Sequence, residues 1–269
     1  MQETTAARAD SPFPLSWHVI AGSDIGVAHQ RRGGINEDAH LSASLCDRTL
    51  LLTAADGAGF ARFAAQASQK AVECTIELLS KFGSPPDAES WPTLLHEVVA
   101  SVRSSLLEAT VAATKNAPTQ TVRKHDFATT LLIAVATPHW LAALQIGDGA
   151  IVVRLKDGEL LRATEAFRGE HAGETVFVTS DTYRDHVSTN IIPTDRVGGI
   201  ALLTDGLEPV ATVGAEREPY APFFNPLFDF TASNKDPYKK SLELRSFLAT
   251  DRINARTHDD KTLLLAVPA

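Results

Sequence analysis

Two apolar segments that lie far apart in the chain each end on an aspartate followed by a glycine. The first reads "LLLTAADGAGF" over residues 50–60, and the second reads "IALLTDGLEP" over residues 200–209. One aspartate at the end of a strand is ordinary turn chemistry, because Asp and Gly both tolerate tight turns. Two such endings in one chain favour a functional role for the carboxylates.

The first of these segments belongs to a predicted β-hairpin. Residues 39–46 alternate between apolar and polar side chains, which is the period of a half-buried strand, and a continuous apolar strand follows over residues 49–55. A turn centred on Asp47 sets Asp38 opposite Asp56. Two carboxylates held so close repel each other unless a cation lies between them. The hairpin therefore predicts a bound metal ion.

The remaining pattern groups helices with helices and strands with strands. Helical spacing predicts helices over residues 60–82, 91–115 and 241–250. Apolar runs predict strands over 127–136, 140–146 and 150–155, joined as an antiparallel meander with Asp148 in its second turn, and a last strand directly after Asp259 and Asp260. Because the elements do not alternate as β-α-β, the sequence predicts an α+β fold with antiparallel sheets covered by helices.

Composition excludes several classes of protein. The chain has 269 residues, 44% of them hydrophobic, which is enough to form the core of a single domain over residues 15–269. Residues 1–14 are polar, contain proline and lack periodicity, so we expect a flexible tail there. A net charge of −8 and a pI near 5.6 argue against nucleic-acid and membrane partners, which select clustered Lys and Arg. No apolar stretch is long enough to span a bilayer, and Cys46 and Cys74 have no ligand spacing. We expect a cytoplasmic protein with reduced cysteines.

Acidic side chains recur at predicted strand ends and turns. They are Glu37, Asp38, Asp56, Asp148, Asp205 and Asp259. Taken singly, each is more often a turn or capping residue. Taken together, without His or Cys beside them, they form an oxygen-rich donor set that suits Mg²⁺ or Mn²⁺ better than zinc. The carbonyl of Gly57 is a further candidate ligand, because glycine lets the backbone approach closely.

The motifs that carry these acids, in order, are "NEDA", "ADGAG", "FATT" with "IGDGAIVVR", "LLTDGLE" and "HDDKT". Their order and spacing resemble the metal-dependent serine/threonine protein phosphatases of type 2C, the PPM family, over roughly residues 18–267. "GVAHQRRGGINEDA" and "GEHAGETVFVTSD" are similar to the compact bacterial branch of that family. The resemblance implies a four-layer αββα fold, an antiparallel β-sandwich flanked by helices on both faces. It also implies hydrolysis of phosphoserine and phosphothreonine in proteins.

The resemblance also implies roles for the acids. Asp56 would bridge two metal ions, with Glu37 and the Gly57 carbonyl on one of them. Asp205 and Asp259 would hold the other ion, and Asp148 would contribute with Asp205 to a weaker third. Asp38 would orient metal-bound water. A pair of ions lowers the pKa of a bridging water and leaves hydroxide available for in-line attack on phosphorus.

Two positions depart from the family pattern. Many members have an arginine five residues before the position of Asp38, where this chain has Gly33. Arg31 and Arg32 are candidates to bind phosphate in its place, or are solvated loop charges. Animal members have a histidine where this chain has Ala58. His29 is a candidate substitute for that proton donor, or a structural loop histidine, so the general acid is not assigned by the sequence.

One segment is expected to vary among family members, and a second to be specific to this branch. Residues 167–194 are polar and turn-rich and suit a flap beside the site. Residues 211–240 are the expected insertion, with several prolines and aromatic residues. We interpret Phe223, Phe224, Phe228 and Phe230 as a satellite core first and as a partner surface second.

The implied partners are a phosphorylated protein substrate and, as a further candidate, a cognate Ser/Thr kinase. The alternative is a catalytically silent regulator of the same fold that binds a phosphoprotein or a kinase. The retained acids count against it, because nothing else would offset their repulsion. Phosphatases with an aspartyl nucleophile need a DxD arrangement, and Ala54 stands two residues before Asp56. The sequence excludes that class.

Overall fold

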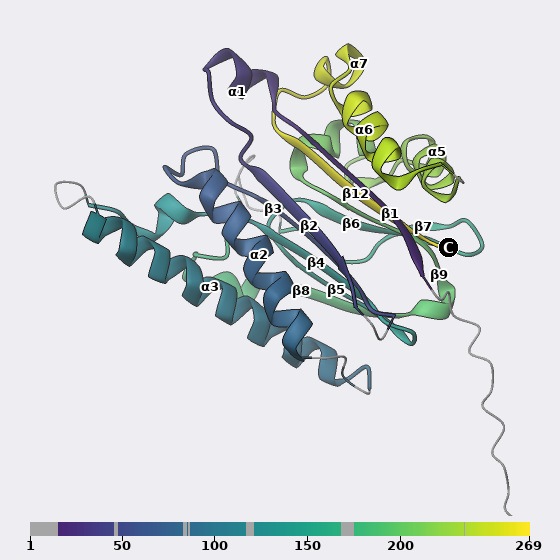
Figure 1. Ribbon diagram of the computed structural model, residues 1–269, viewed down its shortest axis with the longest axis horizontal. Coiled ribbons are helices and arrows are strands. Elements are labelled where there is room, and N and C mark those ends of the chain that lie inside the picture. The colour runs from purple at the N-terminus through teal and green to yellow at the C-terminus, as the bar shows by residue number, and fades with distance from the viewer. Residues whose placement is uncertain are drawn as a thin grey trace, which may run out of the picture.

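The protein folds into two stacked antiparallel β-sheets with helices on both outer faces (Figure 1). The computed structural model describes residues 16–45, 48–82, 85, 87–116, 121–167, 175–233 and 235–269. The arrangement confirms the predicted α+β sandwich of four layers. The expected tail over residues 1–14 and the turn residues Cys46 and Asp47 lie outside the described residues.

The first sheet has five strands in the order β2-β3-β4-β5-β8. Their bounds are β2 Asp38–Ser44, β3 Leu50–Asp56, β4 Leu131–Ala136, β5 Trp140–Ile146 and β8 Ser188–Pro193. Its outer face packs on α2 (Ala64–Phe82) and α3 (Ser90–Asn116). Successive strand residues point to opposite faces, so Leu51 packs in the core shared with α2 and α3 while Leu52 packs between the sheets.

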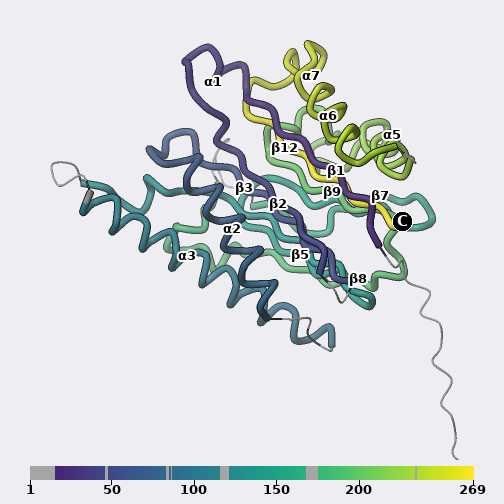
Figure 2. Tube along the Cα trace, in the orientation of Figure 1, coloured from purple at the N-terminus to yellow at the C-terminus, as the bar shows by residue number. Residues whose placement is uncertain are grey.

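The second sheet has five strands in the order β1-β12-β9-β6-β7. Their bounds are β1 Trp17–Asp24, β12 Lys261–Pro268, β9 Val197–Leu203, β6 Ala150–Leu155 and β7 Leu160–Arg162. Figure 2 shows β1 and β12, from opposite ends of the chain, running side by side, and they pair in register from Trp17↔Pro268 to Asp24↔Lys261. The edge strand β1 therefore takes its place in the sheet by pairing with the last strand of the chain.

The outer face of the second sheet is covered by α5 (Ala221–Ala232), α6 (Pro237–Leu248) and α7 (Asp251–Asn254). Phe224 and Phe228 are fully buried there and Phe230 is partly buried, which confirms their expected packing role. Buried Lys240 donates from Nζ to the carbonyl oxygens of Thr231 and Ser233 at 2.6 and 2.9 Å. These bonds satisfy carbonyls that the end of α5 leaves open and join α5 to α6.

The predicted hairpin is confirmed in its register. β2 and β3 pair antiparallel, and Asp38 lies opposite Asp56 at the open end of the pair. The predicted helix over 60–82 begins later, at Ala64, and the strand expected from Phe127 begins at Leu131 because residues Lys124–Phe127 form a 3₁₀ turn.

The predicted meander over residues 127–155 is wrong in its second turn. β4 and β5 pair as expected, but β5 belongs to the first sheet and β6 to the second, so "GDG" is a crossover between sheets. Gly147 adopts a φ of 104°, and a Cβ there would lie 2.5 Å from Cγ2 of Thr130. The buried amide of Gln145 donates to the carbonyls of Gly147 and Gly149 and fixes the crossover.

The shorter elements lie mainly around the open ends of the sheets. They are α1 Val27–Arg31, α4 Glu208–Ala211, β10 Thr212–Val213, β11 Glu218–Pro219, and 3₁₀ turns at Lys124–Phe127, Tyr183–His186, Thr194–Arg196 and Asp205–Leu207. Residues 168–174 of the expected flap lie outside the described residues, and its last part forms the edge strand β8. In the described parts of the chain, no helix combines the length and apolar character needed to cross a membrane.

Candidate active site

The acids expected from the sequence meet at one end of the two sheets, around a cavity of about 750 Å³ that we call the acidic cavity. It is lined by Glu37, Asp56, Gly57, Asp148, Asp205 and Asp259. Glu37 and Asp56 come from the β2–β3 end, whereas Asp205 and Asp259 adjoin strands of the other sheet. The sandwich thus brings together carboxylates that are separated by long stretches of sequence.

Asp38 lies beneath this lining rather than in it. Its Oδ2 accepts hydrogen bonds from the hydroxyls of Thr204 and Thr262 at 2.8 and 2.7 Å. Its Oδ1 is buried and has no hydrogen-bond partner among the described residues. Burial raises the pKa of Asp38 to about 8 against the opposing effect of the two threonine hydroxyls, and the charges of Asp260 and Asp205 raise it further.

Asp56 and Asp205 lie close enough across the sheet boundary for each carboxyl group to affect the pKa of the other. Burial, followed by the charges of Asp38 and Asp205, raises the pKa of Asp56 well above its usual value. Burial and the charge of Asp148 raise the pKa of Asp205 to about 7. A fully ionised pair is therefore costly without a cation.

The donor set fits a hard divalent cation. Burial raises the pKa of Glu37 and of Asp148 as well. Oε2 of Glu37 and Oδ1 of Asp205 are buried without a hydrogen-bond partner in the described structure. Oxygen atoms that are buried, negatively charged and unpartnered match the ligands that Mg²⁺ and Mn²⁺ prefer.

The turn after Asp56 requires glycine. A Cβ on Gly57 would lie 2.4 Å from the carbonyl oxygen of Ala64, at the start of α2. The Gly57 amide donates to the carbonyl of Glu37 at 3.1 Å, which links the two sides of the hairpin end. This close packing holds Gly57 in the lining of the cavity and explains why the strand ends on Asp-Gly.

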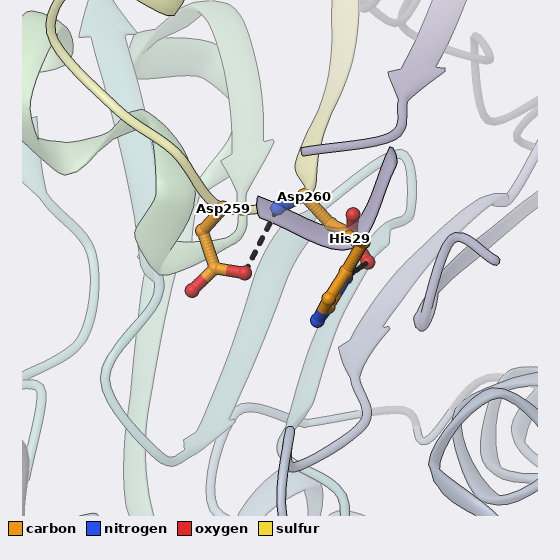
Figure 3. A group of neighbouring side chains, drawn as sticks. All are labelled: His29, Asp259 and Asp260. Atoms are coloured by element: carbon orange, nitrogen blue, oxygen red, sulfur yellow. Dashed lines mark hydrogen bonds and ion pairs between the residues drawn. The ribbon is translucent and has the colours of Figure 1, made fainter. Parts of the chain in front are cut away.

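Sequence analysis missed a residue that organises the site, Asp260. Its Oδ1 accepts from the amide of Gly26 at 2.6 Å, and its Oδ2 accepts from the amide of Glu37 at 2.6 Å and faces Nδ1 of His29 at 3.0 Å. Figure 3 shows His29 beside Asp260, and Asp259 next to them, where it accepts a hydrogen bond from the Asp260 amide at 2.9 Å. The doubled acid in "HDDKT" was the available signal, since neighbouring residues entering a strand point to opposite sides.

Of the other residues predicted for the site, some line the acidic cavity and one does not. His29 lies in the lining with its Nε2 3.7 Å from Oε2 of Glu37. Arg32 lines the cavity, whereas Arg31 is exposed and outside the lining. Ala58 is buried in the lining, and no proton donor stands at its position. The geometry therefore favours Arg32 over Arg31 for contact with an anion in the cavity.

The crossover that carries Asp148 is held by a partly buried ionic group. Glu208 lies 2.6 Å from Nη1 of Arg217 and 3.6 Å from Nη1 of Arg162. Arg162 also donates to the carbonyl of Gly149 at 3.1 Å. Burial raises the pKa of Glu208 even though both arginines lower it. This group ties the Asp148 turn to the β10–β11 hairpin, a link that the sequence did not predict.

Comparison with known proteins agrees with this geometry. Residues 25–249 match the family model described as protein phosphatase 2C. The chain is 30% identical over 259 residues to "Serine/threonine-protein phosphatase 3" of Escherichia coli (strain K12), covering 94% of this chain and 99% of that protein.

Solved structures with the same fold include serine/threonine phosphatase Stp1 from Staphylococcus aureus, at TM-score 0.62 and 15% identity over 93% of this chain and 94% of that one. The serine/threonine phosphatase PstP/Ppp of Mycobacterium tuberculosis matches at TM-score 0.61 and 18% identity, over 93% and 98% of the two chains. At these identities the structures show the fold alone. The family match and the curated relative show more: the chain is a homologue of a serine/threonine-protein phosphatase and belongs to the protein phosphatase 2C family.

Proposed function

We propose that the chain hydrolyses phosphoserine and phosphothreonine in proteins with the help of divalent metal ions bound in the acidic cavity. The family is generally metal-dependent. The observation that carries the proposal is the cluster of buried carboxylates with raised pKa values and unpartnered oxygens, on Glu37, Asp38 and Asp205. Among the described residues, His29, Arg32 and Arg217 lower the pKa of Glu37 or Asp148 only in part. Divalent cations would offset the repulsion that remains around Asp38, Asp56 and Asp205.

The ligand assignment follows the donor positions. Asp56 stands between the two sheets and suits a bridging ligand, with Glu37 and the Gly57 carbonyl on one side. Asp205 and Asp259 suit the second ion. Asp148, together with Asp205, suits a weaker third ion. Each ion would be Mn²⁺ or Mg²⁺. When bound, such ions supply Lewis acidity and a hydroxide nucleophile at neutral pH.

The chain's own groups orient the reactants. The Thr204 and Thr262 hydroxyls engage one oxygen of Asp38 and leave Oδ1 open, so Asp38 can accept a hydrogen bond from the attacking water. Arg32, on the cavity wall, suits an electrostatic contact with the phosphate. Arg31 takes this role only if the α1 loop rearranges.

His29 has two candidate roles. Its Nδ1 faces Asp260, so Nε2 is the ring atom available toward Glu37 and the cavity. It either donates a proton to the departing serine or threonine oxygen, or orders the loop that carries Arg31 and Arg32. We favour the second role, because both ring nitrogens already face carboxylates of the chain.

The test is phosphate release from a phosphothreonine peptide in Mn²⁺ or Mg²⁺, repeated with EDTA and with Asp56→Asn. We expect turnover that EDTA abolishes and that metal restores. Tight peptide binding without metal-dependent turnover would instead support the silent regulator. Two further expectations stay predictions, a cognate Ser/Thr kinase as partner and a cytoplasmic location. Of the two cysteines, Cys74 is a free thiol, and Cys46 lies outside the described residues.

A further inference from the structure

A second cavity of about 570 Å³ opens beside the acidic cavity, and most of the residues that line it are apolar. We call it the apolar groove; its walls include Val213, Tyr220, Phe223, Leu227, Phe247 and Ile253. Phe223 and Ile253 belong to the packed core over the second sheet, so the floor of the groove is preformed. Val213 and Tyr220 form an exposed rim, with 53% and 43% of their surface accessible.

The apolar groove adjoins the acidic cavity. Pro209 and Arg256 line both. Nη2 of Arg256 donates to the carbonyl of Pro209 at 3.1 Å, so these two residues form a common wall. Pro209 follows Asp205 by one helical turn, and Arg256 precedes Asp259 by three residues. A chain that leaves the acidic cavity across this wall enters the apolar groove directly.

The charges on the lining differ in sign between the two cavities. The charged residues on the described lining of the groove are Arg252 and Arg256, both exposed, whereas the acidic cavity is dominated by carboxylates. The whole chain has a net charge of −8, yet every charged side chain on the described lining of this groove is cationic. Such a surface is complementary to an apolar peptide segment that contains an acidic residue.

We propose that the apolar groove binds the substrate polypeptide next to its phosphoresidue. It takes one bulky aliphatic or aromatic side chain, with Arg252 and Arg256 favouring an acidic neighbour. The inference rests on the proposed phosphatase function and adds a determinant of which phosphoproteins are chosen. Burial of such a side chain should strengthen binding roughly 10- to 100-fold.

The experiment uses the full chain and phosphothreonine peptides of Gly, Ser and Ala in which a single Leu is moved through the flanking positions. Positions within about five residues on either side are sampled, since an extended chain advances ~3.3 Å per residue. Val213→Glu places a charge on the rim. Val111→Glu is the matched control, because Val111 is also exposed, at 56%, but lies on α3 in the opposite layer. Binding of fluorescein-labelled peptides is measured in parallel by fluorescence polarisation, with hydrolysis-resistant phosphonate analogues.

We expect kcat/KM to rise about tenfold or more when Leu occupies one or two neighbouring positions. Val213→Glu should remove this preference through KM, and Val111→Glu should keep it. Hydrolysis of p-nitrophenyl phosphate, which is too small to reach the groove, should be equal in all variants. Arg252→Glu should selectively weaken peptides with Glu beside the Leu.

Several results would overturn the inference. Equal kcat/KM for all Leu positions in the wild type, or equal losses in the two valine variants, would show that the groove does not select substrate. A dimer that Val213→Glu dissociates would assign the groove to a second copy of the chain. Absence of any metal-dependent turnover would instead refute the proposed function, and the polarisation assay would still decide whether the groove binds the peptides.

Discussion

Oδ2 of Asp260 lies 3.0 Å from Nδ1 of His29 and also accepts the amide of Glu37 at 2.6 Å, although 223 residues or more separate these partners in sequence. One carboxylate, 3% exposed, thus fixes both the α1 loop and the start of β2. His29 and Glu37, which line the cavity on this side, are thus held by a residue that lies outside the lining. Asp260 is therefore a positioning residue.

Asp260→Asn should weaken the site without removing a ligand. The amide keeps one acceptor oxygen, so Gly26, Glu37 and His29 can no longer all be satisfied. Loss of such outer contacts typically lowers metal affinity by about 10- to 100-fold. Titration calorimetry with Mn²⁺ measures this loss, and Asp195→Asn, an exposed residue after β8, is the control. Unchanged Mn²⁺ affinity in Asp260→Asn would show that the Glu37 loop holds its position by other means.

Asp56→Asn and Asp205→Asn should each lower turnover by several orders of magnitude while keeping the fold. Both substitutions disturb the carboxyl pair proposed to hold the ions, and both remove a charge from a site with excess negative charge. The metal-free melting temperature should therefore rise or stay unchanged. Phosphopeptide kinetics and differential scanning fluorimetry in EDTA measure the two effects. Near-normal kcat in either variant would refute the metal assignment.

The metal-free protein should lose stability as the pH rises from 5 to 8.5. Asp38 and Asp205 have folded-state pKa values of about 8 and about 7, above the ordinary value of 3.8, because burial disfavours their charged forms. Their stabilising effect is complete below the unfolded pKa and is lost as pH rises through the folded pKa. The melting temperature in EDTA should fall by several degrees across this range, and Mn²⁺ should reverse the fall. A flat profile in EDTA would contradict the raised pKa values, and Asp205→Asn should flatten it in part.

Asp148→Ala should retain tight binding of two ions and lose turnover at limiting metal. Asp148 lies at the crossover between sheets, where its charge acts on Asp205, and we propose that its carboxyl suits only the weaker third position. Excess Mn²⁺ should restore part of the rate. Calorimetric titration separates the sites, and loss of both tight sites would mean that Asp148 belongs to the central group.

The hairpin register could be predicted because it depends on local signals. Residue alternation in β2, the apolar run of β3 and a short turn together set Asp38 opposite Asp56. The "GDG" crossover gives the same local signal as a hairpin turn. Its true course depends on β8, which pairs with β5 from more than forty residues further along the chain. The same limit explains Asp260, whose partners Gly26, His29 and Glu37 lie near the other end of the sequence.

The last prediction concerns the proton that the departing serine or threonine oxygen needs. Ala58 offers none, and a general acid typically contributes about 10²- to 10⁴-fold when the leaving group is a basic alkoxide. If His29 donates it from Nε2, His29→Ala should slow a phosphothreonine peptide severely and spare p-nitrophenyl phosphate, whose phenolate leaves without help. If His29 orders the loop that carries Arg32, both substrates should suffer alike, chiefly through KM. We expect the second outcome, because Nδ1 of His29 lies 3.0 Å from Asp260 and Nε2 lies 3.7 Å from Oε2 of Glu37, so both ring nitrogens face carboxylates of the chain. His29→Asn keeps a donor toward Asp260 through its shorter amide. Partial recovery of KM in His29→Asn would therefore support the ordering role. A loss in His29→Ala that is confined to kcat on the phosphopeptide would refute it.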